Sequence, residues 1–128
     1  MRRIPFSFTT VVSTTAQNSK NFNPLMGYVD AGDVKKSRIV WETIGAPSGI
    51  SITQGVQAAN SDQSPDNPTE PAGQTATTTN VVTTTALLDV SATTASKQLV
   101  RPGLYVANTG SAAQLSCRVV GFWETDDK

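Results

Sequence analysis

The segment that most constrains the fold runs from residue 113 to residue 124, where two sets of side chains alternate. One set consists of Ala113, Leu115, Cys117, Val119, Gly121 and Trp123. A period of two over so long a run is typical of a β-strand with one buried face and is hard to reconcile with a helix. We therefore predict a strand with Cys117, Val119 and Trp123 in the core. Phe122 would lie on the opposite face, against a loop or a partner.

Other segments have the residue types and spacing of strands. They are residues 6–14, 37–44, 50–56, 80–90 and 103–107. A turn-forming cluster at 108–111 predicts a β-hairpin between the run at 103–107 and the last strand. Pro102 cannot donate to a ladder, so we expect it at a strand start or on an edge strand. Only residues 91–99 leave room for a helical turn. Six strands predict an all-β fold, a single β-sandwich or jelly-roll-like barrel.

The composition indicates one domain over residues 1–128. The chain has 128 residues, 38% of them hydrophobic, which is enough for a single core. Ten basic residues balance ten acidic ones and form no long basic stripe, so nucleic acid is not an expected partner. No window approaches the length of a membrane span. Zero net charge with 16% charged residues gives little electrostatic repulsion between copies, which favours a role as a component of a larger protein assembly.

The residue types argue against catalysis. The chain has no histidine, which removes the commonest general base and the commonest metal ligand. Cys117 is the only cysteine, so it has no disulfide partner in the chain, and its place in the alternating strand favours a core role over a nucleophilic one. Glu42, Glu70 and Glu124 come from two strands and a loop, with nothing to pair two of them across a bond. We expect no enzyme activity and no cofactor, and a reducing compartment during synthesis.

Residues 58–79 have no apolar period and contain Pro65, Pro68 and Pro71. We interpret this segment as an extended loop that lies on a neighbouring protein, because prolines reduce the entropy lost on ordering. Asp62, Asp66 and Glu70 follow at four-residue intervals in it. Solvated loop charge is the simpler interpretation of these acids, and a Ca²⁺ site is the alternative.

The first residues have a basic start but no clear cleavage site, so we interpret residues 1–8 as an ordered N-terminal arm and not as an export signal. Arg2 and Arg3 could anchor this arm by charge. Trp41 or Phe122 could form a platform for a carbohydrate if either ring pointed outward. The residues predicted to lie at an interface are Arg2, Arg3, Phe6, Asp62, Pro65, Pro68, Pro71 and Phe122.

The chain resembles the small decoration or cement proteins of tailed-bacteriophage heads in its general organisation. The resemblance lies in its Thr-rich, histidine-free β character, the segment 1–8, the loop 61–73 and the strand 115–123. It implies a β-rich module, often trimeric, that is made in the host cytoplasm and sits in the virion between major capsid subunits. The partner would be the major capsid protein or another virion protein. A tail, neck or minor virion component, and a glycan- or receptor-binding β-sandwich, are the alternatives.

Overall fold

The computed structural model describes residues 2–14, 17–30, 34–44, 50–76, 82–84, 87–108 and 113–125. The elements in these residues are β1 (Arg2–Thr14), β2 (Gln17–Pro24), β3 (Val29–Asp30), β4 (Val34–Ile44), β5 (Ile50–Ala59), β6 (Val82–Thr84), β7 (Leu88–Asp89), α1 (Ser91–Thr94), β8 (Leu99–Asn108) and β9 (Ala113–Thr125). The expected helical turn within 91–99 is confirmed by α1. No helix in the described part of the chain is long and apolar enough to cross a membrane.

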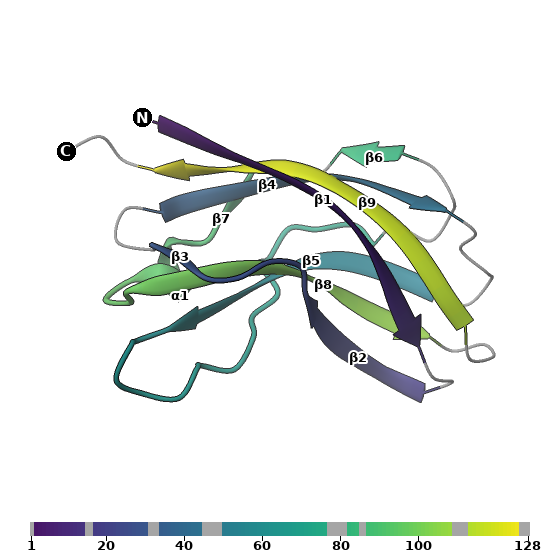
Figure 1. Cartoon of the computed structure of the whole chain (residues 1–128), viewed down its shortest axis with the longest axis horizontal. Coiled ribbons are helices and arrows are strands. Elements are labelled where there is room, and N and C mark those ends of the chain that lie inside the picture. Colours follow the sequence, from purple (N-terminus) through teal and green to yellow (C-terminus); the bar gives the residue numbers. More distant parts are fainter. Residues whose placement is uncertain are drawn as a thin grey trace.

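The strands form two antiparallel sheets that face each other (Figure 1). Sheet A has the order β1-β9-β4, and the short strands β6 and β7 pair with the far edge of β4. Sheet B has β8 at its centre, with β5 along one edge and β2 followed by β3 along the other. The start of β1 lies beside the end of β9, because Arg2 is opposite Thr125 in the register.

The strand pairs are nested along the sequence. The first strand pairs with the last, β1 with β9, and β2 pairs with β8 inside that pair. Further inside, β4 pairs with β6 and β7, and β5 forms a bridge from Val56 to Thr69 in the loop that follows it. An antiparallel ribbon rolled up in this way into two sheets is a jelly roll. The predicted all-β, jelly-roll-like fold is therefore confirmed.

Several predicted strands differ in extent or connection. The predicted hairpin before the last strand is wrong, since β8 belongs to sheet B and β9 to sheet A. The chain crosses between the sheets at that point and does not turn back within one of them. The predicted strand 80–90 is represented by two short strands, β6 and β7, that pair with separate parts of β4. β2 and β3 were not predicted, because the residues of β2 are mostly polar.

Pro102 lies inside β8, the central strand of sheet B, and not at the predicted strand start or sheet edge. Its partner on β5 is Val56, whose N–H and C=O are both bonded to Thr69 on the far side of β5. The polar groups of Pro102 therefore face the other way, toward the break between β2 and β3. There its carbonyl accepts a hydrogen bond from the Leu25 N–H at 3.1 Å. The proline is tolerated because its nitrogen faces the break between β2 and β3, where neither strand pairs with it and no N–H donor is needed.

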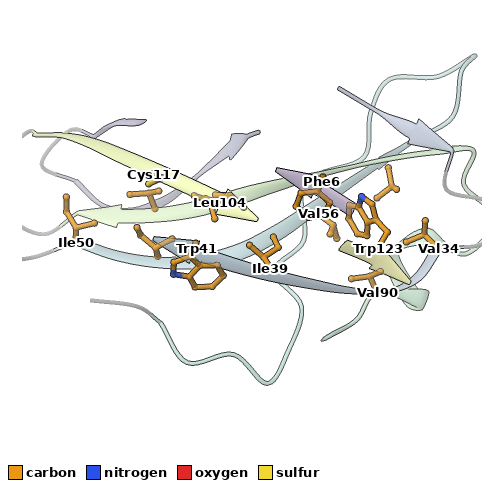
Figure 2. Packing of buried hydrophobic residues seen from close by; sticks show 14 residues of the cluster. Phe6, Val34, Ile39, Trp41, Ile50, Val56, Val90, Leu104, Cys117 and Trp123 are labelled. Atoms are coloured by element: carbon orange, nitrogen blue, oxygen red, sulfur yellow. The ribbon is translucent and has the colours of Figure 1, made fainter. Parts of the chain in front are cut away.

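The core fills the space between the sheets (Figure 2). Trp41, Ile39, Trp123 and Val119 enter from sheet A, while residues of β5 and β8 enter from sheet B. Cys117, Val119 and Trp123 are at most 1% exposed, as the alternation in the sequence predicts. Complete burial of a large apolar side chain contributes about 1.5–3 kcal/mol relative to exposure, so these residues dominate the stability of the fold.

The segment after β5 folds back on its own chain. Val56 and Thr69 exchange backbone hydrogen bonds of 2.9 and 2.7 Å, and the Asp66 N–H donates to the Ala58 carbonyl at 2.9 Å. We call residues 60–76 the edge loop, because they cover the outer edge of β5. The described part of this segment was expected to be an extended arm, and it instead lies along β5 and is held there by contacts within the chain. Residues 77–79 of the predicted loop lie outside the described residues.

The predicted N-terminal arm is, from residue 2 onward, the first half of β1. Its pairing with β9 runs without a register shift from Arg2 to Thr14. Residues 2–8 therefore lie on this chain's own sheet and do not extend away from it. Sheet A ends at β1, which makes β1 an edge strand.

Candidate interaction surface

One face of sheet A points away from the core, and we call it the outer face. Phe6 of β1, Ile39 of β4 and Val119 of β9 point into the core, so their neighbours along each strand point outward. The outward residues are Arg3, Pro5, Ser7, Thr9 and Val11 of β1, Arg118, Val120 and Phe122 of β9, and Arg38, Val40 and Glu42 of β4.

The centre of the outer face contains a hollow of about 360 Å³. The described residues that line it are Val40, Trp41, Glu42, Arg118 and Val120. Val40 lies opposite Val120 in the register, and Val120 is 39% exposed. The next outward pair is Glu42 opposite Arg118, which adds one acidic and one basic side chain. An apolar floor bordered by charged side chains is the arrangement found at contacts between proteins.

Arg3 covers two side chains at one end of the outer face. Its Nε lies 3.3 Å from Oε1 of Glu124, and its guanidinium carbon lies 4.6 Å from the centre of the Phe122 ring. Glu124 is only 4% exposed although its strand position faces outward. Arg3 thus pairs with a covered carboxylate and stacks on a half-buried ring. The Arg3 side chain is itself 65% exposed, so the ion pair contributes about 1 kcal/mol or less.

The charges at this end alternate across sheet A. Lys36 of β4 lies opposite Glu124, and Asp89 of β7 lies opposite Lys36. The pKa of Asp89 is lowered, first by hydrogen bonds from Ser91 and then by the positive charge of Lys36. One of these bonds runs from the Ser91 N–H to Oδ1 of Asp89 at 2.9 Å. Opposite charges on neighbouring strands help to set the register of this part of the sheet.

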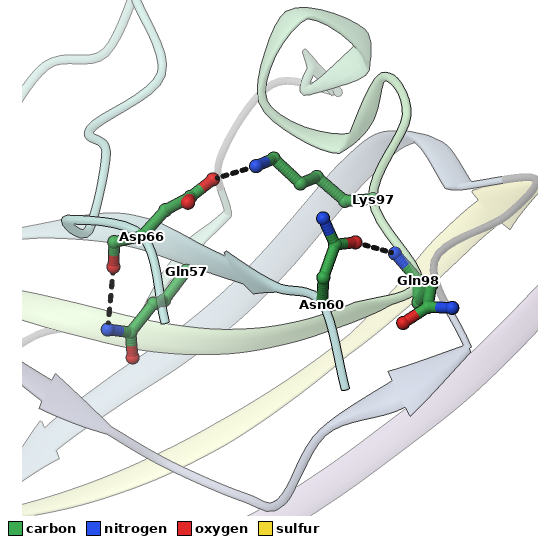
Figure 3. Close-up of polar contacts among 5 residues, drawn as sticks. All are labelled: Gln57, Asn60, Asp66, Lys97 and Gln98. Atoms are coloured by element: carbon green, nitrogen blue, oxygen red, sulfur yellow. Dashed lines mark hydrogen bonds and ion pairs between the residues drawn. The ribbon is translucent and has the colours of Figure 1, made fainter. Parts of the chain in front are cut away.

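The edge loop forms a second polar surface, on sheet B. Nζ of Lys97 lies 2.8 Å from Oδ2 of Asp66, and Nε2 of Gln57 donates to the Asp66 carbonyl at 2.9 Å (Figure 3). Near the start of the loop, the Gln98 N–H donates to Oδ1 of Asn60 at 3.1 Å. These contacts tie the loop to β5 and to the segment before β8. Lys97 neutralises Asp66, which is one of the three acids that could have formed an ion site.

The described residues contain no group of three side chains that could hold a metal ion. Of the three acids considered from the sequence, Asp62 is exposed, and Asp66 pairs with Lys97. Glu70 is half-buried. The structure does not bring these acids together as a Ca²⁺ site.

Some predicted interface residues lie on the surface. Arg3 and Phe122 are brought together on the outer face. Asp62 and Pro65 are exposed in the edge loop, where Pro68 is half-buried. The two groups come from different sheets, so they do not form one continuous site. Arg2 is placed only as the first residue of β1.

Two predicted interface residues are buried inside the chain. Phe6 is 8% exposed, and its ring centre lies 5.8 Å from that of Trp123. Pro71 is buried where the edge loop lies over β5. The prediction that these two side chains contact a neighbour is wrong, because the chain's own core and edge loop already enclose them.

The candidates for chemistry and for sugar binding are also enclosed. Burial raises the pKa of the Cys117 thiol to about 11, so the thiol is neutral at physiological pH. The Trp41 side chain is 1% exposed, and the Arg3 guanidinium lies over the Phe122 ring. Neither aromatic named from the sequence therefore offers an open platform.

The sequence did not predict the hollow or the pairing of Val40 with Val120 at its centre. The alternation along the last strand already places Val120 outward, since Val119 is inward. However, Val40 comes from a strand far away in the sequence, and only the register of β4 against β9 brings the two valines together. A doublet such as Val119–Val120 inside an alternating strand is the signal that could have found half of this site.

Comparison with known proteins identifies the fold. No protein-family model matches the chain, and no curated protein sequence matches it. Among solved structures, the VP2 subviral particle of infectious bursal disease virus matches with a TM-score of 0.61, 12% identity and coverage of 97% of this chain. T=1 particles derived from the same virus match with a TM-score of 0.62 and 11% identity over 97% of this chain.

A third match, with the T13 particle of that virus, has a TM-score of 0.62 and 11% identity over 98% of this chain. This chain spans about a third of the length of these proteins, from 32% to 33%. At such low identity the similarity shows the fold alone. The class of fold is therefore a two-sheet jelly roll of the kind that forms part of these viral capsid proteins.

Proposed function

We propose that this chain is a structural protein of a virion that binds and stabilises a capsid lattice, as a decoration or cement protein does. The observation that supports this proposal best is the apolar hollow of the outer face, with Val40 and Val120 at its centre. It lies on a jelly roll of the kind found in viral capsid proteins. In this proposal the partner is the major capsid protein or another virion protein, and the chain is located in the virion.

The proposed mechanism is burial of surface and not catalysis. A contact centred on Val40 and Val120 would remove apolar surface from water, and Glu42 and Arg118 would orient the partner by charge. Each copy needs only a modest affinity, because a lattice presents many equivalent sites. The absence of histidine and the neutral, buried thiol of Cys117 support a non-catalytic role.

The test is co-sedimentation with particles assembled from the major capsid protein that is encoded with this chain. We expect the chain to sediment in a fixed ratio to capsid subunits and to raise the temperature at which the particles break open. Val120→Lys places a charge on the hollow floor and should weaken binding by about tenfold or more. Gln63→Lys, a change of equal charge at an exposed position of the edge loop, is the matched control and should bind normally.

Two outcomes would contradict the proposal. One is a chain that neither sediments with the particles nor changes their thermal stability. The other is equal binding by the wild type and by a folded Val120→Lys variant, which would exclude the hollow as the contact. Circular dichroism should show that both variants keep the strand content of the wild type.

A further inference from the structure

The outer edge of β1 differs from the other sheet edges of the described chain. The edge of β5 is covered by the edge loop. The outer edge of β4 is occupied by β6 and β7, which have three and two residues. β2, on the remaining edge of sheet B, has a register shift between Gln17 and Lys20 and ends at Pro24. Short, bulged or covered edges of these kinds resist pairing with another chain.

The edge of β1 has little of this protection. Its thirteen residues pair with β9 without a bulge. The charged residues Arg2 and Arg3 and the single proline, Pro5, are all near its start. From residue 6 to residue 14 the strand contains no charge, no proline and no glycine. A long, regular, uncharged edge is a template for a further strand.

The residues with backbone groups at this edge follow from Pro5. A proline in an edge strand has its nitrogen toward the open side, where no N–H is needed. In an antiparallel strand, the N–H and C=O of one residue point the same way, and the direction alternates along the chain. Ser7, Thr9, Val11 and Ser13 therefore direct their N–H and C=O groups to the open edge. Val11 is also 59% exposed on the outer face, more than Val120 or Leu87.

We infer that the outer edge of β1 is a strand-pairing site for the same edge of a second copy. The pairing joins sheet A of the two copies into one continuous sheet, with a two-fold axis near Thr10. Ser7 then lies opposite Ser13 of the second copy, and Thr9 lies opposite Val11. Pro5 stays outside the paired segment. Such a contact is isologous and closes after two copies.

The charge distribution selects the antiparallel arrangement. Parallel pairing of two β1 strands would place Arg2 and Arg3 of one copy beside the same residues of the other, and like charges directly opposite are destabilising. The antiparallel pair places the arginines of the two copies beyond opposite ends of the paired segment. A second copy is the partner that fits best because the three other described edges are short, bulged or covered. The inference is independent of the proposed function, and it predicts a dimer where the phage resemblance implies a trimer.

The first test is the mass in solution, by sedimentation velocity or light scattering over a range of concentrations. We expect a species of twice the 13.5 kDa of one chain. Val11→Lys places two like charges near the two-fold axis and should raise the dimer dissociation constant at least about tenfold. Val120→Lys makes the same change on the same face but on a central strand, so its dimer should match the wild type.

The second test fixes the register by cross-linking. Thr9→Cys and Val11→Cys are purified singly and mixed. In the hydrogen-bonded pair of residues 9 and 11, the Cα atoms would be about 5.5 Å apart, within the range of a disulfide. Oxidation should give a cross-linked dimer in the mixture and little with either variant alone. The buried Cys117 thiol should not compete. A chain that stays monomeric, a folded Val11→Lys variant that dimerises normally, or a mixture without cross-links would overturn the inference.

Discussion

The side chain of Gln74 pairs with the backbone of Gln54 at both ends of its amide group. The Gln54 N–H donates to Oε1 of Gln74 at 2.8 Å, and Nε2 of Gln74 donates to the Gln54 carbonyl at 2.9 Å. The same Nε2 also donates to the Pro71 carbonyl at 2.9 Å. The amide thus takes the place of a strand residue at the edge of β5 and continues the contact that Thr69 begins at Val56.

Substitution of Gln74 should therefore loosen the edge loop. Gln74→Ala removes the hydrogen bonds to the Gln54 backbone and should lower the free energy of unfolding by about 1–2 kcal/mol. Gln63→Ala, at an exposed position of the same loop, should change it by less than about 0.5 kcal/mol. Urea unfolding measures both, and hydrogen exchange should show faster exchange at the Gln54 N–H in the first variant only. Equal exchange in the two variants would show that the amide does not hold the loop.

Gly103 is required for the packing of β2 on β8. A β-carbon at this position would lie 2.7 Å from the Asn23 carbonyl oxygen and would overlap the Phe22 ring. Gly103→Ala should lower the free energy of unfolding by about 1–3 kcal/mol, because the backbone of β2 must move. At Gly27, a β-carbon would meet no atom within 4 Å, so Gly27→Ala serves as the matched control and should be nearly neutral. Thermal unfolding compares the two, and similar melting temperatures would contradict the close approach.

The contacts of Arg3 can be separated by two substitutions. Arg3→Ala loses both the ion pair with Glu124 and the stacking on Phe122, and should cost about 1 kcal/mol of stability. Arg3→Lys keeps the charge but loses the planar group, so it should cost less. The difference between Arg3→Ala and the wild type should shrink in about 1 M salt, because the exposed ion pair is screened. Urea unfolding at low and high salt measures this, and a difference that salt leaves unchanged would assign the effect to stacking alone.

The sequence predicted those strands in which buried and outward-pointing side chains alternate regularly. β9 lies between β1 and β4 with one face in the core, so its side chains alternate, and Cys117 and Trp123 were placed correctly. β2 has no such pattern, because its polar residues are held by pairing with β8, a strand far away in the sequence. The turn signal at 108–111 could not show that the chain crosses from one sheet to the other. Such a turn signal looks the same whether the next strand pairs in the same sheet or joins the other sheet.

The candidate site was predicted less well than the fold, for a related reason. Phe122 was correctly predicted to point outward. However, the residue that stacks on its ring is Arg3 of β1, at the other end of the sequence, which lies opposite Glu124 in the register. The hollow depends on the register that brings Val40 beside Val120. The edge loop was interpreted as lying on a neighbouring protein, because Gln74 and Thr69 give no sequence signal that they bind β5. Pairing between distant segments determined each of these features.

The Cys117 thiol should make stability depend on alkaline pH. Burial raises its pKa in the folded chain to about 11, from a reference value of 9.0 that applies to the unfolded chain. Above about pH 9 the unfolded state releases this proton while the folded state retains it, so the free energy of unfolding should fall as pH rises. The contribution is complete below about pH 9 and is lost as the pH approaches about 11. Urea unfolding from neutral pH upward measures this fall.

The matched control for this pH effect is Cys117→Ala, which has no thiol to ionise. The variant should be less stable at neutral pH, because it leaves a small cavity beside Val119, but its stability should fall less steeply at alkaline pH. All other ionisable groups are common to the two proteins, so the difference between the two slopes isolates the thiol. The native thiol should also react slowly with a soluble disulfide reagent at mildly alkaline pH and rapidly once urea unfolds the chain. Parallel slopes, or fast reaction in the folded state, would contradict the burial of Cys117 between the two sheets.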